Sequence, residues 1–209
     1  MKILFYGDSI TDAGRNYEAP YGEESYGAGY VRYIIENLKK EGFADEDLLN
    51  RGISGNRIVD LYARIKVDCW NHNPDFISIL IGVNDVWHEV VGGNGVEIDR
   101  FEKVYRMLIE DTFKKLPNVK MLLCEPFVLK GTATEEQFAR FEEVYNYAAV
   151  VKKLAKEYGL DFLPLQEKLS EAAATSNVSE YLRDGVHPAE AGAKLIATEW
   201  LKLFNEKIK

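Results

Sequence analysis

Short apolar runs alternate with segments of helical periodicity from one end of the chain to the other. The runs are four to six residues long, typical of buried β-strands, and lie at 3–6, 47–50, 76–81, 119–124 and 160–163. The run at 76–81, FISILI, is the most continuous. We therefore expect five strands, with the one at 76–81 covered on both faces.

Four of the remaining segments place apolar residues three and four positions apart, the spacing of an amphipathic helix. These apolar positions are Tyr30, Ile34, Ile35 and Leu38; Ile58, Leu61, Tyr62 and Ile65; Phe101, Val104, Tyr105 and Leu108; and Ala193, Ile196, Trp200 and Phe204. The last of these helices is expected to begin at Pro188, because proline suits the first helical position.

A fifth, long helix is expected to open at Thr134, since Thr134 and Gln137 match a capping box. Its apolar face would carry Phe138, Phe141, Tyr145 and Ala148. Strands that alternate with helices indicate βαβ units and a parallel sheet. The fold class we predict is α/β, a three-layer α/β/α sandwich formed by a single domain over 1–209, without repeats or linkers.

Charge and composition exclude several classes of function. The 209 residues carry 26 Lys and Arg against 34 Asp and Glu, a formal charge of −8. Neither nucleic acid nor an anionic membrane is therefore an expected partner, because both need a cationic face. The apolar run at the N-terminus is too short for a signal peptide, and no stretch is long enough to span a membrane. We expect a soluble cytoplasmic protein, unless a leader was removed.

Few residues are available to hold a metal or form disulfides. The chain has two cysteines, Cys69 and Cys124, and three histidines, His72, His88 and His187. Two cysteines make no disulfide framework, and no histidine pair has the spacing of a zinc site. No metal or cofactor is expected, and whether the chain forms a homo-oligomer stays open.

Small and polar residues follow the predicted strands, at the sheet edge where open α/β folds bind ligands. They are found at 7–10, 51–56, 82–85 and, before the last helix, 184–188. Each motif alone is typical of an ordinary turn or helix entry. Because all four are expected at one edge of one sheet, we interpret them together as a site for acyl transfer.

The residue types at this edge match the parts of a serine hydrolase. Ser9 is the candidate nucleophile, and His187 is a base that is neutral near pH 7. Asp184, three residues earlier, would fix the histidine tautomer. The backbone N–H groups of Ser9 and Gly52 and the side-chain amide of Asn84 are the candidate oxyanion donors.

The four motifs, in this order, resemble the SGNH hydrolase superfamily in its GDSL esterase branch. The matching blocks are GDSITD at 7–12, RGISGN at 51–56, GVND at 82–85 and DGVHP at 184–188. The resemblance covers nearly the whole chain. It implies a flavodoxin-like sheet of five parallel strands and hydrolysis of esters, or in some members thioesters, without metal or cofactor. It also assigns the catalytic roles to the residues named above.

The segments beside the blocks resemble bacterial carbohydrate esterases, acetylxylan esterases in particular. The substrate implied is an acetylated oligosaccharide, with a lysophospholipase or thioesterase as the alternative. Asp8, Trp87 and His88 are the candidate substrate-binding residues, with Asp8 more typical of a structural acceptor in its turn. A glycine-rich segment at 92–95 predicts a flexible loop near the site.

Two other functions remain as alternatives. Asp8 at the end of the first strand could serve phosphoryl hydrolysis with a magnesium ion, although no acidic cluster follows it. A carbohydrate-binding protein without activity is the other alternative, and the complete set of catalytic residue types speaks against it.

Overall fold

A parallel sheet of five strands forms the centre of the structure, a computed structural model that describes residues 1–208. The strands are β1 (Ile3–Gly7), β2 (Leu48–Gly52), β3 (Phe76–Leu80), β4 (Lys120–Cys124) and β5 (Asp161–Leu163). Their order in the sheet is β2-β1-β3-β4-β5, and every pair is parallel. This is the flavodoxin-like order, so the predicted fold class is confirmed.

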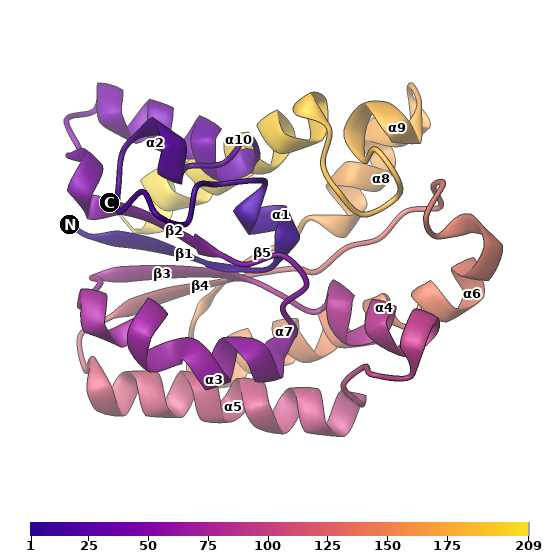
Figure 1. Ribbon diagram of the computed structural model, residues 1–209, viewed down its shortest axis with the longest axis horizontal. Coiled ribbons are helices and arrows are strands. Elements are labelled where there is room, and N and C mark those ends of the chain that lie inside the picture. Colours follow the sequence, from indigo (N-terminus) through magenta and orange to yellow (C-terminus); the bar gives the residue numbers. More distant parts are fainter. Residues whose placement is uncertain (209) are drawn as a thin grey trace.

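Helices cover both faces of this sheet (Figure 1). On one face α2 (Tyr30–Lys40) packs beside α10 (Glu190–Lys207), and on the other lie α3 (Ile58–Asp68), α5 (Ile98–Lys115) and α7 (Val144–Tyr158). The shorter helices are α1 (Ser9–Asp12), α4 (Val83–Gly92), α6 (Phe138–Phe141), α8 (Gln166–Ala174) and α9 (Val178–Tyr181). Short 3₁₀ turns lie at Glu23–Ser25, Asp45–Asp47, Trp70–His72 and Glu135–Gln137.

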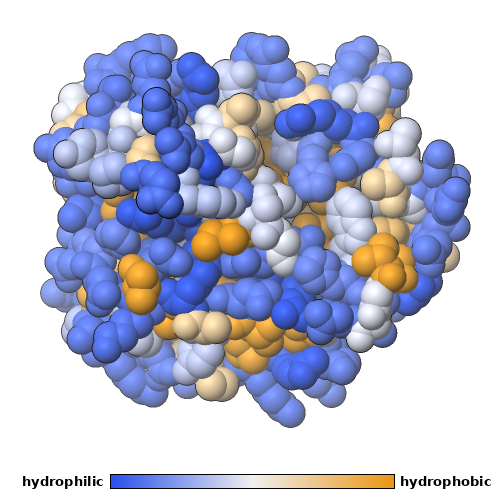
Figure 2. Space-filling view, viewed as in Figure 1, coloured by the Kyte–Doolittle hydropathy of each residue, from blue (hydrophilic) through white to orange (hydrophobic). Residues whose placement is uncertain are grey.

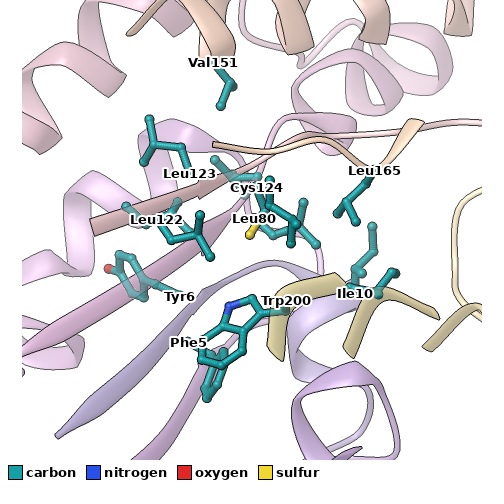
Figure 3. Packing of buried hydrophobic residues seen from close by; sticks show 14 of the residues in the cluster. Phe5, Tyr6, Ile10, Leu80, Leu122, Leu123, Cys124, Val151, Leu165 and Trp200 are labelled. Carbon is teal, nitrogen blue, oxygen red and sulfur yellow. The ribbon is translucent and has the colours of Figure 1, made fainter. Parts of the chain in front are cut away.

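The core beneath α2 and α10 is built around one tryptophan (Figure 3). Trp200 of α10 is fully buried, with its ring centroid 5.3 Å from that of Phe5 in β1 and 5.9 Å from that of Phe76 in β3. Its indole Nε1 donates to Ser78 Oγ at 2.9 Å, so the only polar atom of the ring is satisfied. The last helix is thereby held against the middle of the sheet.

The predicted long helix after Thr134 is wrong in its start and its continuity. The Thr134 side chain caps no helix; its Oγ1 donates to Leu129 O at 2.7 Å instead. A 3₁₀ turn, α6 and α7 replace the single helix, and the interruption turns Tyr145 outward, where it is 38% exposed. Local periodicity therefore misplaced one residue of the predicted apolar face.

The last helix also begins later than predicted. Its N-cap is Ala189, and Pro188 instead pairs with Leu182 in an isolated antiparallel bridge. This bridge closes a tight loop over 183–187. The helices α1, α4, α8 and α9 were not predicted from the periodicity; α9 is a single turn capped by the Asn177 side chain.

The surface is mostly hydrophilic on the face drawn in Figure 2, where apolar residues lie in small separate groups. Within residues 1–208, no helix combines the length and the apolar character needed to cross a membrane. Both cysteines are buried as free thiols.

Candidate active site

The nucleophile candidate stands at the first position of α1, directly after β1. Asp8 is the N-cap of this helix, and its Oδ1 accepts from the Ile10 N–H at 2.9 Å. Ser9 is thereby placed at the carboxyl edge of the sheet, beside the point between β1 and β3 where the strand order reverses.

Three side chains form a hydrogen-bonded line at this edge. Ser9 Oγ lies 2.9 Å from His187 Nε2, and His187 Nδ1 lies 2.7 Å from Asp184 Oδ2. The other carboxylate oxygen, Asp184 Oδ1, accepts from the backbone N–H of His187 at 2.8 Å and of Val186 at 3.0 Å. Residues 178 positions apart in the chain are thus brought together in the order nucleophile, base and acid.

Electrostatics set the ionisation of this line. Burial alone would raise the pKa of Asp184, but hydrogen bonds from the His187 ring and from two backbone N–H groups lower it to about 2. The hydrogen bond to Asp184 raises the pKa of His187, against an opposing effect of burial. Asp184 is therefore a carboxylate at neutral pH and stabilises the imidazolium form of its partner.

Gly52 does not offer the N–H that the sequence predicted for an oxyanion. Its N–H donates to Asn50 Oδ1 at 2.9 Å, and its carbonyl accepts from Arg15 Nε at 2.8 Å. Gly52 is needed for another reason: an added Cβ would lie 2.2 Å from the Asp12 nitrogen. The residue allows β2 to pass close to α1, and its backbone is occupied there.

Gly55, three residues further on, takes the place expected for Gly52. It lines a hollow together with Ser9, Asn84 and His187. Its N–H has no hydrogen-bond acceptor in the described part of the chain. Its φ of +81° lies in the left-handed region, where glycine carries no steric cost. The block at 51–56 contains both Gly52 and Gly55, and the sequence alone does not show which of the two glycines has a free N–H.

Two anchors hold the peptide groups around Gly55. On one side Asp12 Oδ2 accepts from the Ser54 N–H at 2.9 Å, from Ser54 Oγ at 2.5 Å and from Tyr17 OH at 2.6 Å. On the other side Asn56 O accepts from Asn84 Nδ2 at 3.0 Å. Asp12 is buried, with 2% of its surface exposed, so α1 and the loop after β2 are joined by a shielded carboxylate.

Asn84 is the remaining donor candidate that the structure brings to Ser9. It lies in the first turn of α4 and lines the same hollow as Ser9. One N–H of its amide is used by Asn56 O, which leaves the second N–H of the same nitrogen free to reach a bound ligand. The Ser9 backbone N–H also has no acceptor within residues 1–208.

Two hollows open on either side of Ser9 and His187, and Ser54 lines both. The α4 hollow, about 400 Å³, is further lined by Gly55, Asn84, Trp87, His88 and Val91. The α1 hollow, about 390 Å³, is further lined by Ile10, Ala13, Gly14, Ala28, Gly29, Arg183 and Pro188. An ester bound at Ser9 can extend one part into each.

Trp87 and His88 lie where a substrate can reach them. The Trp87 ring centroid is 5.7 Å from that of His187 and 5.6 Å from that of Phe141, which holds the indole in place. Burial, helped by the charge of Arg57, lowers the pKa of His88, so its imidazole is neutral at pH 7. Both side chains belong to the wall of the α4 hollow.

Asp8 cannot contact a substrate as the sequence suggested. It is fully buried, and its Oδ2 has no hydrogen-bond partner in the described residues. Burial raises the pKa of this carboxyl to about 7, although the Ile10 N–H opposes the shift. Asp8 acts from inside, as the cap of the helix that carries Ser9.

The glycine-rich segment after α4, predicted to be a flexible loop, is held by hydrogen bonds to α4 and to Arg57. Arg57 Nη1 donates to Asn94 O at 2.7 Å, and the Gly95 N–H donates to Glu89 Oε2 at 3.1 Å.

Among residues 1–208, no group of three or more histidine, cysteine or acidic side chains is arranged to hold a metal ion.

Comparison with known proteins places this geometry in a family. A model of the GDSL-like lipase/acylhydrolase family matches residues 5–195. The chain is 36% identical to an acetylxylan esterase from Geobacillus stearothermophilus, over 96% of this chain and 92% of that protein.

Solved structures of similar proteins point to the same family. A protein from Parabacteroides merdae described as a GDSL-like lipase superposes with a TM-score of 0.90 at 37% identity, covering 98% of this chain and 95% of the other. The acetylxylan esterase superposes with a TM-score of 0.81 at 33% identity, covering 96% and 92%. The chain therefore belongs to the GDSL-like lipase/acylhydrolase family and is a carboxylic ester hydrolase.

Proposed function

We propose that this hydrolase works through an acyl-enzyme on Ser9 and removes short acyl groups, acetyl above all, from carbohydrate. The observation that carries the mechanism is the line of hydrogen bonds from Ser9 through His187 to Asp184. In the esterase from Geobacillus stearothermophilus, variants that lack a serine, an aspartate or a histidine are described as catalytic mutants. These are the three residue types of the line in this chain.

In the first step His187 Nε2 takes the Ser9 proton while Oγ attacks the ester carbonyl carbon. The carbonyl oxygen gains the negative charge and accepts hydrogen bonds from the Ser9 N–H, the Gly55 N–H and the Asn84 amide. Asp184 stabilises the imidazolium that forms. Loss of one oxyanion donor typically costs about 3–4 kcal/mol of transition-state stabilisation.

In the second half His187 passes its proton to the leaving alcohol oxygen as the ester C–O bond breaks. The acyl group stays on Ser9. A water molecule then gives a proton to His187 and attacks the acyl carbon. The tetrahedral intermediate collapses, the proton returns to Ser9 Oγ, and the carboxylic acid leaves.

The carbohydrate substrate is supported by the acetylxylan esterase at 36% identity and by a solved variant described as an acetyl-xylooligosaccharide esterase. In this chain, Trp87 offers an aromatic face in the wall of the hollow beside His187. Polar side chains such as Ser54 and Asn84 in the same wall suit the hydroxyl groups of a sugar.

The test compares acetate release from acetylated xylo-oligosaccharides with hydrolysis of p-nitrophenyl esters of increasing acyl length. Wild type should release acetate rapidly and slow steeply as the acyl chain lengthens, and Ser9→Ala should lose this turnover while its circular dichroism stays native. Rapid turnover only on long acyl chains would replace the proposal with a lysophospholipase or thioesterase. Undiminished turnover by Ser9→Ala would remove Ser9 as the nucleophile.

A further inference from the structure

The α1 hollow contains one fixed cation close to the catalytic histidine. Arg183 directly precedes Asp184, and its Nε and Nη2 donate to Pro188 O at 3.2 and 3.1 Å. Its backbone N–H donates to His187 O at 2.8 Å. The guanidinium is therefore held in one orientation by the loop that carries the catalytic residues, and a ligand that binds it loses little further side-chain freedom.

This cation lacks a carboxylate partner. None of the ion pairs in the described chain involves Arg183, and its Nη1 donates to no acceptor within residues 1–208. The described lining of the α1 hollow includes no Asp or Glu, so Arg183 and His187 are its only ionisable side chains. The Arg183 side chain is exposed, so a ligand in the hollow can reach its free N–H groups from solvent.

The position of Arg183 carries an electrostatic cost for the reaction. The hydrogen bond to Asp184 and the charges of Asp184 and Asp8 raise the pKa of His187, and the charge of Arg183 opposes them by a smaller amount. An anion bound at the guanidinium would neutralise this repulsion while the imidazolium forms. A substrate that brings a negative charge to the guanidinium would remove this opposing effect in the transition state, whereas a neutral substrate would leave it in place.

We propose that the α1 hollow binds a carboxylate or phosphate group on the alcohol part of the ester. An acetyl group has no charge, so the anion has to belong to the alcohol part. The planar guanidinium still has N–H groups free at its Nη1 end, and such a fork matches the two oxygens of a carboxylate or phosphate. The preferred substrates are then acetylated acidic sugars, such as uronate-bearing oligosaccharides or sugar phosphates.

The inference rests on the proposed esterase function and concerns this chain rather than its relative. In the esterase from Geobacillus stearothermophilus a tryptophan directly precedes the aspartate whose replacement gives a catalytic mutant. Arg183 holds the equivalent position before Asp184 here. A neutral aromatic residue offers no anion site, so the two enzymes should differ in their response to substrate charge.

The experiment measures kcat/KM for two matched pairs of acetyl esters. One pair is an acetylated uronate-bearing xylo-oligosaccharide and its uronate methyl ester; the other is an acetylated sugar phosphate and the same sugar without phosphate. The deciding quantity is the ratio of the charged to the neutral member. Wild type should give a ratio of about 10 or more in at least one pair, and that pair identifies the anion.

Arg183→Met should bring this ratio to about one or below, because it removes the charge and keeps much of the side-chain volume. Arg183→Lys should keep part of the preference for the charged substrate, since lysine retains the positive charge but lacks the forked N–H groups of the guanidinium. Arg32→Met is the matched control, because Arg32 pairs with Glu36 on α2 and lines neither hollow. Its ratio should equal that of wild type.

A wild-type ratio near one in both pairs would overturn the inference, and so would an unchanged ratio in Arg183→Met. Equal slowing of both members by Arg183→Met means that Arg183 only supports Pro188. Absence of Ser9-dependent turnover on every member would instead refute the proposed function, so the two failures are distinguishable.

Discussion

At the scale of single residues, His187 controls the reaction through its proton. It must be neutral to accept the proton of Ser9, and the hydrogen bond to Asp184 raises its pKa. Activity is therefore lost as pH falls through this raised pKa and regained as pH rises. We expect the acid limb of kcat/KM to have its midpoint above 6.5, the ordinary value for histidine.

The measurement is a pH profile of kcat/KM with an acetyl ester. Asp184→Asn should shift the limb to lower pH, and it should lower the rate by about 10⁴-fold. Asp8→Asn is the control, because the pKa of Asp8 is also close to 7 although the residue is fully buried. The limb should persist in that variant. A wild-type midpoint at or below 6.5, or loss of the limb in Asp8→Asn, would contradict this assignment.

At the scale of elements, the Asp12 carboxylate joins α1 to the loop that carries Gly55. Three donors converge on its Oδ2. Asp12→Asn keeps the size of the side chain but removes the charge that strengthens these bonds. We expect kcat to fall about 10-fold with little change in KM, because a loosened oxyanion donor matters only in the transition state.

Asp111→Asn is the matched control for Asp12→Asn. Asp111 also accepts from a tyrosine hydroxyl, that of Tyr62 at 2.7 Å, but it lies on α5, away from both hollows. Its kinetics should equal those of wild type. An unchanged kcat in Asp12→Asn would show that the Asp12 carboxylate does not position the Gly55 N–H. A rise in KM that accounts for the whole loss of kcat/KM would show the same.

The elements also show what the sequence can and cannot predict. The strands were predictable from their sequences, because a strand buried on both faces appears as a short run of consecutive apolar residues. The start of the last helix was predicted wrongly at Pro188, because the antiparallel bridge between Pro188 and Leu182 depends on tertiary contacts. Tyr145 was misplaced because the helix is interrupted before it, which periodicity alone does not reveal.

The candidate site was predictable for the same reason as the sheet. Ser9 and Asn84 follow from the rule that strand ends meet at one edge. Asp184 and His187 were assigned to the same edge from their position before the last helix, although α8 and α9 separate them from β5. Gly52 could not be distinguished from Gly55, because one glycine ends β2 and the other lies three residues later in the same block. Only the structure shows that the Gly52 N–H is occupied, by its hydrogen bond to Asn50 Oδ1. The burial of Asp8 likewise depends on its surroundings in three dimensions.

At the scale of the whole molecule, stability depends on how the last helix is packed on the sheet. Trp200 is fully buried among Phe5, Phe76 and Phe204, with its indole bonded to Ser78. Trp200→Ala would leave a cavity and remove the indole donor from Ser78 Oγ, which would keep only its 3.5 Å hydrogen bond with Cys124 Sγ. We expect the free energy of unfolding to fall by about 3–5 kcal/mol, measured by urea denaturation.

Tyr145→Ala is the control for this prediction. Tyr145 is 38% exposed, so its truncation should change the free energy of unfolding by much less than that of Trp200. A loss below about 1.5 kcal/mol in Trp200→Ala would mean that the surrounding rings close the cavity, and that the helix does not depend on this contact.

The most direct test of Ser9 as the nucleophile is covalent labelling with a fluorophosphonate, followed by peptide mapping. The reagent needs a serine oxygen activated by a neighbouring base. We expect one label per chain, on Ser9, formed together with the loss of esterase activity and absent from His187→Ala. Labelling at another residue, or full esterase activity in the chain labelled at Ser9, would contradict this expectation.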